Sequence, residues 1–413
     1  MKLFGTIALV SIIQAFLFFL SLCLVCDFLV EKNKNVIIAF LLVCPFILGT
    51  SVFLETNVGA TVFILLSCWF VLYQRHERKL SHLILSTFGL IVSLALTFNL
   101  RPNAIVLVPV FIFFSFLLFI QKKIYRRQVV FLLQITAVIL AIVLSNRLTD
   151  SFVKNSYSFA QPGFLWKGIS VVQNIERNNF YESYFDYYSD TEENATLKAL
   201  KGNESRYFTA IPQNFPIWAC KKERTQSLIE DIIYLSIFHP KATIRVYWDD
   251  FLKLSGIPPL NFWAYESNAW SNGEVFGIPV DSIRNSFYNR YVAFVKTSYV
   301  FLSPWILFSS CSLFLVLHLS TKKGRILVKQ GFFTIYFLLA ISFVYNYAYL
   351  INAQSYEYRY SIPSTIILLI INLALLSSLI NSFFTKEKWP VVLNALFALC
   401  VFTFFCFQLY YLF

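Results

Sequence analysis

Long apolar stretches recur along this chain on both sides of a single polar region, and they constrain its fold more than any other feature. Ten of them are long enough, or nearly so, to cross a hydrocarbon layer about 30 Å thick. They fall near residues 4–26, 36–53, 58–74, 83–99, 103–120, 128–147, 296–318, 331–351, 361–382 and 389–411. A soluble protein of 413 residues would need one or two buried cores, not ten apolar helices. We therefore predict an all-α polytopic membrane protein with about ten transmembrane helices.

Charged residues are scarce and unevenly placed. They make up 14% of the chain, against about 25% in soluble domains. Of the 22 acidic residues, 16 lie between Asp150 and Asp281. This pattern predicts an N-terminal transmembrane bundle of about six helices at 1–147 and an extracytoplasmic loop domain at 148–295. A C-terminal transmembrane bundle of about four helices follows at 296–413.

The basic residues orient the chain. A net charge of +12 would suggest nucleic acid for a soluble protein, but here the lysines and arginines lie in short clusters between apolar stretches. The clusters are Lys32 and Lys34; Arg75, Arg78 and Lys79; Lys122, Lys123, Arg126 and Arg127; Lys322, Lys323, Arg325 and Lys329; Lys386 and Lys388. With ten spans they all fall on one side, which the positive-inside rule makes cytoplasmic. We expect the bilayer, not nucleic acid, as the partner, and the large loop outside the cytoplasm, most simply at a bacterial plasma membrane.

The large loop has the composition of a folded domain. It holds five of the eight tryptophans, which is too many for a disordered linker. Residues 227–238 are predicted to be helical, and some loop segments are expected at the membrane interface, where tryptophan and tyrosine concentrate. Cys220 is the only cysteine of the loop, so no disulfide within it is expected. The first apolar stretch lacks a small-x-small cleavage pattern and is interpreted as a retained span.

Ionisable residues beside apolar spans are costly and are therefore candidates for function. Glu55 is the only acidic residue in the short turn between the second and third stretches. Arg101-Pro102-Asn103 separates two long apolar stretches on the expected outer side, where an isolated arginine is disfavoured. An arginine there suits a phosphate, which it binds through two parallel hydrogen bonds. The alternatives are a solvated carboxylate for Glu55 and lipid-headgroup anchoring for Arg101.

Two further places on the expected outer side carry charge. The tyrosine-rich turn around Glu357, Arg359 and Tyr360 leads into an apolar helix with proline in its first turn. Its Glu357 and Arg359 could also do no more than pair with each other. In the loop, Asp186 lies in an acidic, aromatic stretch with Glu182 and Asp190, whose spacing of four places them on one helical face. A solvated helix surface explains that spacing as well as a metal or sugar site does.

Motifs for nucleotide-powered chemistry are absent. The chain has no Walker A loop, no Rossmann glycine fingerprint and no HExxH pair. Its four histidines are scattered, so no metal site is predicted.

In their order, the remaining motifs resemble the GT-C class of membrane glycosyltransferases, which includes protein O-mannosyltransferases and lipid A aminoarabinose transferases. Residues 42–57, with Glu55 near the end, resemble a helix and outer turn of that class that carries an acidic residue. Residues 93–109 resemble its helix–RP–helix passage, and residues 356–363 are similar to its late E-x-R-Y-x-x-P motif. His239-Pro240 resembles an HP pair of its large outer loop. The class carries a catalytic acid in a first outer loop, whose equivalent we expect to precede this sequence or to be replaced from elsewhere.

The resemblance implies an enzyme that moves a sugar from a polyprenyl-phosphate carrier to a glycan, lipid or protein hydroxyl. Arg101 and Arg359 are then expected at the phosphate, with Glu55 as the acid–base or metal-positioning residue and Glu357 second. Asn103, Tyr360 and Asp186 are expected to bind substrate. The cofactor stays open, with a divalent metal as one option. Two other classes remain: an envelope polysaccharide polymerase of the O-antigen type, and a transporter or flippase, which usually shows internal symmetry and broken helices that this sequence does not suggest.

Overall fold

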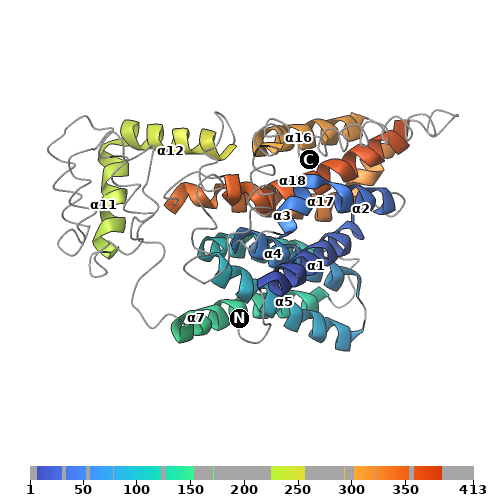
Figure 1. The fold of residues 1–413 in the computed structure, drawn as a ribbon, viewed down its shortest axis with the longest axis horizontal. Coiled ribbons are helices and arrows are strands. Elements are labelled where there is room, and N and C mark those ends of the chain that lie inside the picture. The colour runs from blue at the N-terminus through green and yellow to red at the C-terminus, as the bar shows by residue number, and fades with distance from the viewer. Residues whose placement is uncertain are drawn as a thin grey trace. The chain divides into compact units, whose positions relative to one another are not determined.

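The computed structural model describes residues 7–29, 34–52, 56–77, 79–121, 127–152, 225–255, 302–320, 322–352 and 358–383, together with Val171 and Ala293. Throughout these ranges the ordered elements are helices, and none of them is a β-strand (Figure 1). The elements are α1 (Ile7–Cys26), α2 (Lys34–Val43), α3 (Pro45–Val52), α4 (Thr56–His76), α5 (Leu80–Leu100), the 3-10 helix η1 (Pro102–Leu107), α6 (Val108–Ile120), α7 (Arg127–Phe152), α11 (Thr225–Phe238), α12 (Pro240–Ser255), α16 (Pro304–Ser320), α17 (Lys322–Asn352) and α18 (Tyr358–Phe383).

Six helices in the described ranges are long and apolar enough to span a membrane. They are Asn57–His76, Leu80–Leu100, Asn103–Ile120, Arg127–Leu148, Phe333–Leu350 and Ser361–Leu379. Each coincides with a predicted stretch, so the helical membrane class is supported at these six places. The first and seventh stretches appear as shorter apolar helices, Ile12–Cys26 and Pro304–Ser320. The last stretch and most of the loop lie outside the described residues, so ten spans and a large loop stay predictions.

The chain groups into two compact units. One contains residues 1–148, 255–346 and 357–413, and the other contains residues 149–254 and 347–356. The candidate spans belong to the first unit except for the last residues of the α17 span, while α11 and nearly all of α12 belong to the second. The predicted division at 147 and 295 remains a prediction.

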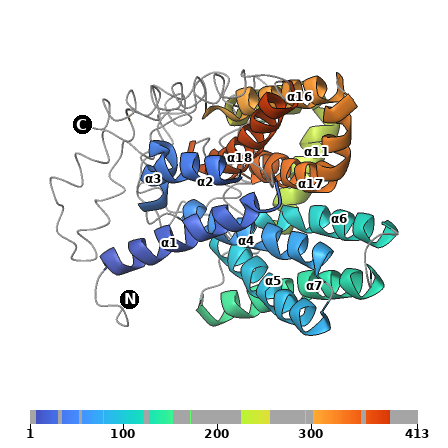
Figure 2. The same cartoon turned by 90° about the vertical axis from the view of Figure 1, so that its right-hand side faces the viewer.

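Helices α4 and α5 form an antiparallel hairpin (Figure 2). The hydroxyl groups of Ser67 and Ser93 are 2.8 Å apart, and Gln74 Nε2 donates to Thr87 Oγ1 at 3.0 Å. All four side chains are buried. The hydrocarbon core of a membrane contains no water that could hydrogen-bond such polar side chains. They therefore hydrogen-bond across the helix pair and fix its register.

Helices α16 and α18 lie side by side and run parallel. Asn372 Nδ2 donates to the Leu307 carbonyl at 3.0 Å, and Ser310 Oγ donates to Asn372 Oδ1 at 2.7 Å. About two turns further along α16 and one turn further along α18, His318 Nε2 lies 3.0 Å from the Leu375 carbonyl. Two parallel transmembrane helices must be connected by a segment that crosses back in the opposite direction. In this chain α17, between α16 and α18, is that segment.

Helix α17 is joined to its neighbours by two kinds of contact. Ser342 of α17 and Ser364 of α18 exchange hydrogen bonds, each hydroxyl donating to the other's backbone carbonyl at 3.1 and 2.8 Å. Four phenyl rings pack together between α6 and α17; they belong to Phe111, Phe114, Phe333 and Phe337. The guanidinium of Arg75, at the end of α4, lies 4.9 Å from the Phe333 ring centre. These contacts bind the N-terminal and C-terminal helices into one unit.

The second predicted stretch is not a single helix. α2 ends at Val43 and α3 begins at Pro45, with Cys44 non-helical between them. Proline cannot donate the hydrogen bond that would continue α2, and its ring disfavours a helical residue before it. The Leu48 amide donates to the Cys44 carbonyl at 2.9 Å and starts the new helix. The expectation of unbroken helices is therefore wrong here.

In the second unit, α11 and α12 meet at a corner (Figure 1). The predicted helix at 227–238 is confirmed as α11, and one residue, His239, separates its end from Pro240. The His239 amide donates to the Leu235 carbonyl at 2.8 Å, and Thr243 closes the corner by donating from Oγ1 to the same carbonyl at 3.4 Å. Proline suits the first turn of α12 because its missing N–H would have no partner there.

Candidate functional site

The Arg101 turn is the part of the predicted site that the structure describes most fully. α5 ends at Leu100, and Arg101 is extended, with φ −142° and ψ 93°. Its amide still donates to the Thr97 carbonyl at 2.9 Å, and its own carbonyl accepts from the Ala104 amide at 2.8 Å. Pro102 then begins η1 directly. An extended residue before proline is the conformation that the proline ring favours, so the Arg-Pro pair turns the chain back within one residue.

The turn lies beside the start of α4. A Cβ placed on Gly59 would be only 3.1 Å from Leu100 Cδ1, which brings the first turn of α4 against the last turn of α5. Asn57 is fully buried there, and its carbonyl accepts from Thr61 Oγ1 at 2.7 Å. The chain segment that follows Glu55 is thus adjacent to the residue that precedes Arg101.

A second helix joins the same end of the bundle. Asn99 Nδ2, two residues before Arg101, donates to Ser145 Oγ of α7 at 3.1 Å. The α5 end, η1 and the α7 end therefore form a polar rim at the limit of the apolar spans. Arg101 and Asn103 lie at this rim.

Arg101 and Asn103 are both half-buried and both interact with neighbouring protein groups. The Nε atom of Arg101 is shielded from solvent. Arginine stays charged in proteins, and a charge near a low-dielectric wall attracts an anion more strongly than one in open water. Chemically, the turn offers one fixed positive charge and one amide at the end of two spans, which suits a phosphate or carboxylate.

The other predicted residues are described in part or not at all. Arg359 and Tyr360 lie in the first turn of α18, described only by their backbone. α18 contacts α4 as well as α16, so the helix that carries Arg359 lies against the helix that follows Glu55. Glu55, Glu357 and Asp186 lie outside the described residues.

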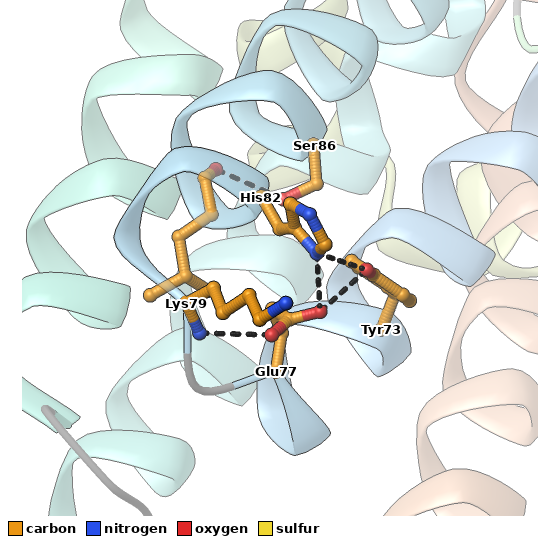
Figure 3. Close-up of polar contacts among 6 residues, drawn as sticks. Tyr73, Glu77, Lys79, His82 and Ser86 are labelled. Atoms are coloured by element: carbon orange, nitrogen blue, oxygen red, sulfur yellow. Dashed lines mark hydrogen bonds and ion pairs between the residues drawn. The ribbon is translucent and has the colours of Figure 1, made fainter.

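Sequence reasoning missed a polar cluster at the α4–α5 turn (Figure 3). One oxygen of Glu77 accepts from the Tyr73 hydroxyl at 2.5 Å and lies 3.0 Å from His82 Nδ1. Its other oxygen accepts from the Lys79 amide at 2.8 Å, at the start of α5. Because a carboxylate only accepts, Nδ1 carries the proton whenever it bonds to Glu77. The close spacing of an acid and a histidine across a predicted turn was the available signal.

This cluster closes the α4–α5 hairpin. Glu77 supplies an acceptor to an otherwise unbonded amide at the start of α5, as a capping side chain does. It also ties that amide to Tyr73 of α4. No group of three or more His, Cys, Asp or Glu residues close enough to hold a metal ion occurs among the described residues.

The chain matches no protein-family model, no curated protein and no solved structure. Its function therefore has to be argued from its own residues.

Proposed function

We propose that this chain is a membrane glycosyltransferase that moves a sugar from a polyprenyl-phosphate carrier to a glycan, lipid or protein hydroxyl. The observation that carries the proposal is the half-buried Arg101 at the α5–η1 turn, at the end of two apolar spans and beside the segment that follows Glu55. A lipid-linked phosphate occupies that depth, because its tail lies among the spans and its headgroup lies at their ends. The resemblance to GT-C enzymes in motif order supports the same reading.

In the proposed reaction Glu55 acts as the base, and Arg101 and Arg359 act on the leaving phosphate. The acceptor hydroxyl attacks the anomeric carbon of the sugar, its proton passes to Glu55, and the bond from that carbon to the phosphate oxygen breaks. The electron pair of the broken bond goes to the phosphate, whose added charge Arg101 and Arg359 stabilise. General-base assistance contributes about 10²–10⁴-fold, and fixed charge at the leaving group adds to it. Glu357 is the second candidate base.

The test is consumption of a lipid-linked sugar by purified protein, measured with and without a divalent metal. We expect Arg101→Ala to reduce turnover by about 10²–10³-fold, as loss of one donor to a developing oxyanion does, while membrane insertion is unchanged. Arg147→Ala is the matched control, because Arg147 is exposed and lies two residues after Ser145 on the same rim. Equal turnover by Arg101→Ala and the unsubstituted protein would remove Arg101 from the mechanism.

The other two classes give different products in the same assay. A polymerase would join lipid-linked glycans to one another, so its product would grow in length on the carrier. A transporter or flippase gains support from the break between α2 and α3, because discontinuous helices hold substrates in many transporters. It would move labelled lipid-linked sugar across a vesicle membrane without forming a new glycosidic bond.

The proposal also states on which side of the membrane the site lies. The basic connections between α4 and α5, α6 and α7, and α16 and α17 favour the cytoplasm for that end of the bundle. The Arg101 turn and the loop between α7 and α16 then face away from the cytoplasm, in a bacterium outside the plasma membrane. Donor, acceptor and bilayer are the partners that this placement implies.

A further inference from the structure

One face of α12 is free and carries a mixture of apolar and basic side chains. Ile244 is 67% exposed and Trp248 is 57% exposed, and both are large hydrophobic residues. Lys241 and Arg245 are exposed as well. On a helix, residues four apart lie in one row, so the apolar pair and the basic pair form two adjacent rows. The apolar row carries no acidic residue, and Asp249 continues the basic row after Arg245.

The opposite face of the same helix is anchored. Ala242, Val246, Asp250 and Leu254 are buried. Burial also raises the pKa of Tyr247, and the charge of Asp250 adds to the rise, so this phenol stays neutral at physiological pH. α12 therefore holds a fixed orientation, and its exposed rows are presented by a packed helix.

Ring stacking connects this face to the end of a membrane span. Trp248 stacks on Phe251, with ring centres 5.5 Å apart, and Phe251 stacks on Tyr347 of α17 at 4.9 Å. Tyr347 lies three residues before the end of the candidate span Phe333–Leu350. A residue at that place in a span lies close to the boundary between hydrocarbon and headgroups. Trp248 and Phe251 are thus joined to a residue at that boundary, and all three belong to the second unit.

We propose that the free face of α12 rests on the bilayer surface, with Ile244 and Trp248 inserted at the headgroup boundary and Lys241 and Arg245 on lipid phosphates. Tryptophan concentrates at this depth in membrane proteins. Helices with apolar residues on one side and basic residues beside them lie in the interface plane, with the apolar face about 5–10 Å into the boundary. Ile237 and Phe238 are also exposed, in the last turn of α11 before the corner. The proposal does not depend on the proposed enzyme activity or on which side of the membrane this end of α17 faces.

The test is a depth measurement on the full chain in lipid vesicles. An environment-sensitive fluorophore is attached through Ile244→Cys and, as the matched control, through Asp249→Cys. Asp249 is exposed on the same helix but lies about 140° around it from Ile244. Unsubstituted protein, treated with the same reagent, gives the background from the native cysteines. We expect bromolipids to quench the label at position 244 and to leave the label at position 249 nearly unquenched.

Three results would overturn the proposal. The two labels could be quenched equally, or the label at 244 could report water. The label at 244 could also report an apolar environment that bromolipids do not quench, which would mean that protein covers the face. Trp248→Cys gives a second position on the same face if the Ile244 variant does not fold.

A charge reversal separates headgroup binding from burial alone. Lys241→Glu combined with Arg245→Glu should reduce bromolipid quenching at position 244 in vesicles of anionic phosphatidylglycerol. It should change quenching much less in neutral phosphatidylcholine, because each basic residue near an anionic surface contributes about 1 kcal/mol. An equal effect in both lipids would overturn the assignment of the basic pair to lipid phosphates.

Discussion

Arg101 illustrates what one residue can reveal when it breaks the apolar pattern around it. A charged side chain within a span has a high free-energy cost, so such a residue is a candidate for a functional role. The sequence predicted both the exceptional position and the turn, and the structure confirms the turn, since α5 ends at Leu100 and η1 begins at Pro102. It could not predict that Gly59 of α4 would lie against that turn, because this neighbour comes from packing between helices.

Glu77 illustrates the opposite case. Glu77, Tyr73 and His82 are each ordinary in sequence, and only the closed hairpin brings them together. We predict that Glu77→Ala lowers the free energy of unfolding by about 1–3 kcal/mol, because three donors lose an acceptor, one of them an amide at a helix start.

Thermal unfolding in detergent measures this loss. Asp249→Ala is the control, because Asp249 is exposed on α12. Tyr73→Phe should remove a smaller part of the same stability, and its effect should not add fully to that of Glu77→Ala. Full additivity of the two would show that the hydroxyl and the carboxylate act independently.

At the scale of elements, small residues decide how closely helices approach. A Cβ on Gly89 of α5 would clash with the Phe70 ring of α4, whereas one on Gly59 would need only a small adjustment of Leu100. We predict that Gly89→Ala destabilises the hairpin by about 1–3 kcal/mol, as overpacking does, and that Gly59→Ala has a smaller effect. Chemical unfolding in mixed micelles measures both.

A compensating substitution makes this prediction specific. Phe70→Leu shortens the side chain that the new methyl group would meet, so it should recover part of the stability lost by Gly89→Ala. If the double variant is less stable than Gly89→Ala alone by the full effect of Phe70→Leu, the clash is not the cause.

The α16–α18 pair depends on polar bonds that cross the interface. Asn372→Ala removes two hydrogen bonds to backbone carbonyls and one from Ser310. Because such bonds in membranes contribute about 0.6 kcal/mol on average and at most about 1.7, we predict a loss of about 1–2 kcal/mol in unfolding by SDS titration.

Ser312→Ala is the matched control for this pair. Its hydroxyl is exposed and bonds only to the Phe308 carbonyl of its own helix. Its effect should be close to zero, and a loss as large as that of Asn372→Ala would assign the effect to helix propensity instead of to the interface.

Some helix boundaries could be predicted from the sequence and others could not. Span positions follow from apolar length alone, so α4 to α7 and α18 lie where they were expected. The break at Cys44-Pro45 was missed because the flanking residues are apolar enough to read as one span. Parallel pairing of α16 with α18 has no sequence signature, since it depends on which faces meet.

For the whole molecule, charge placement makes a prediction about sidedness. Lys79→Cys and Arg325→Cys should react with a thiol reagent only when the reagent is inside the cell, and Arg147→Cys and Lys241→Cys only when it is outside. All four native side chains are exposed, so access to the reagent is expected at each site.

Intact cells and inverted vesicles, treated with the same impermeant reagent, make the measurement. The unsubstituted protein corrects for native cysteines, and of those described only Cys23 is not buried. Labelling of positions 79 and 241 from the same side would contradict the arrangement of spans on which the proposed function is built.

The parallel pairing of α16 and α18 has a consequence for how the chain is made. His318 meets the Leu375 carbonyl, 57 residues later in the chain. A ribosome that adds about 5–20 residues per second reaches that point about 3–11 s after His318. During this interval His318 and Ser310 of α16 have no partner on α18. Until α18 emerges, α16 lacks the helix that its polar side chains bond to, so this interval is when the growing chain is most open to quality-control proteases.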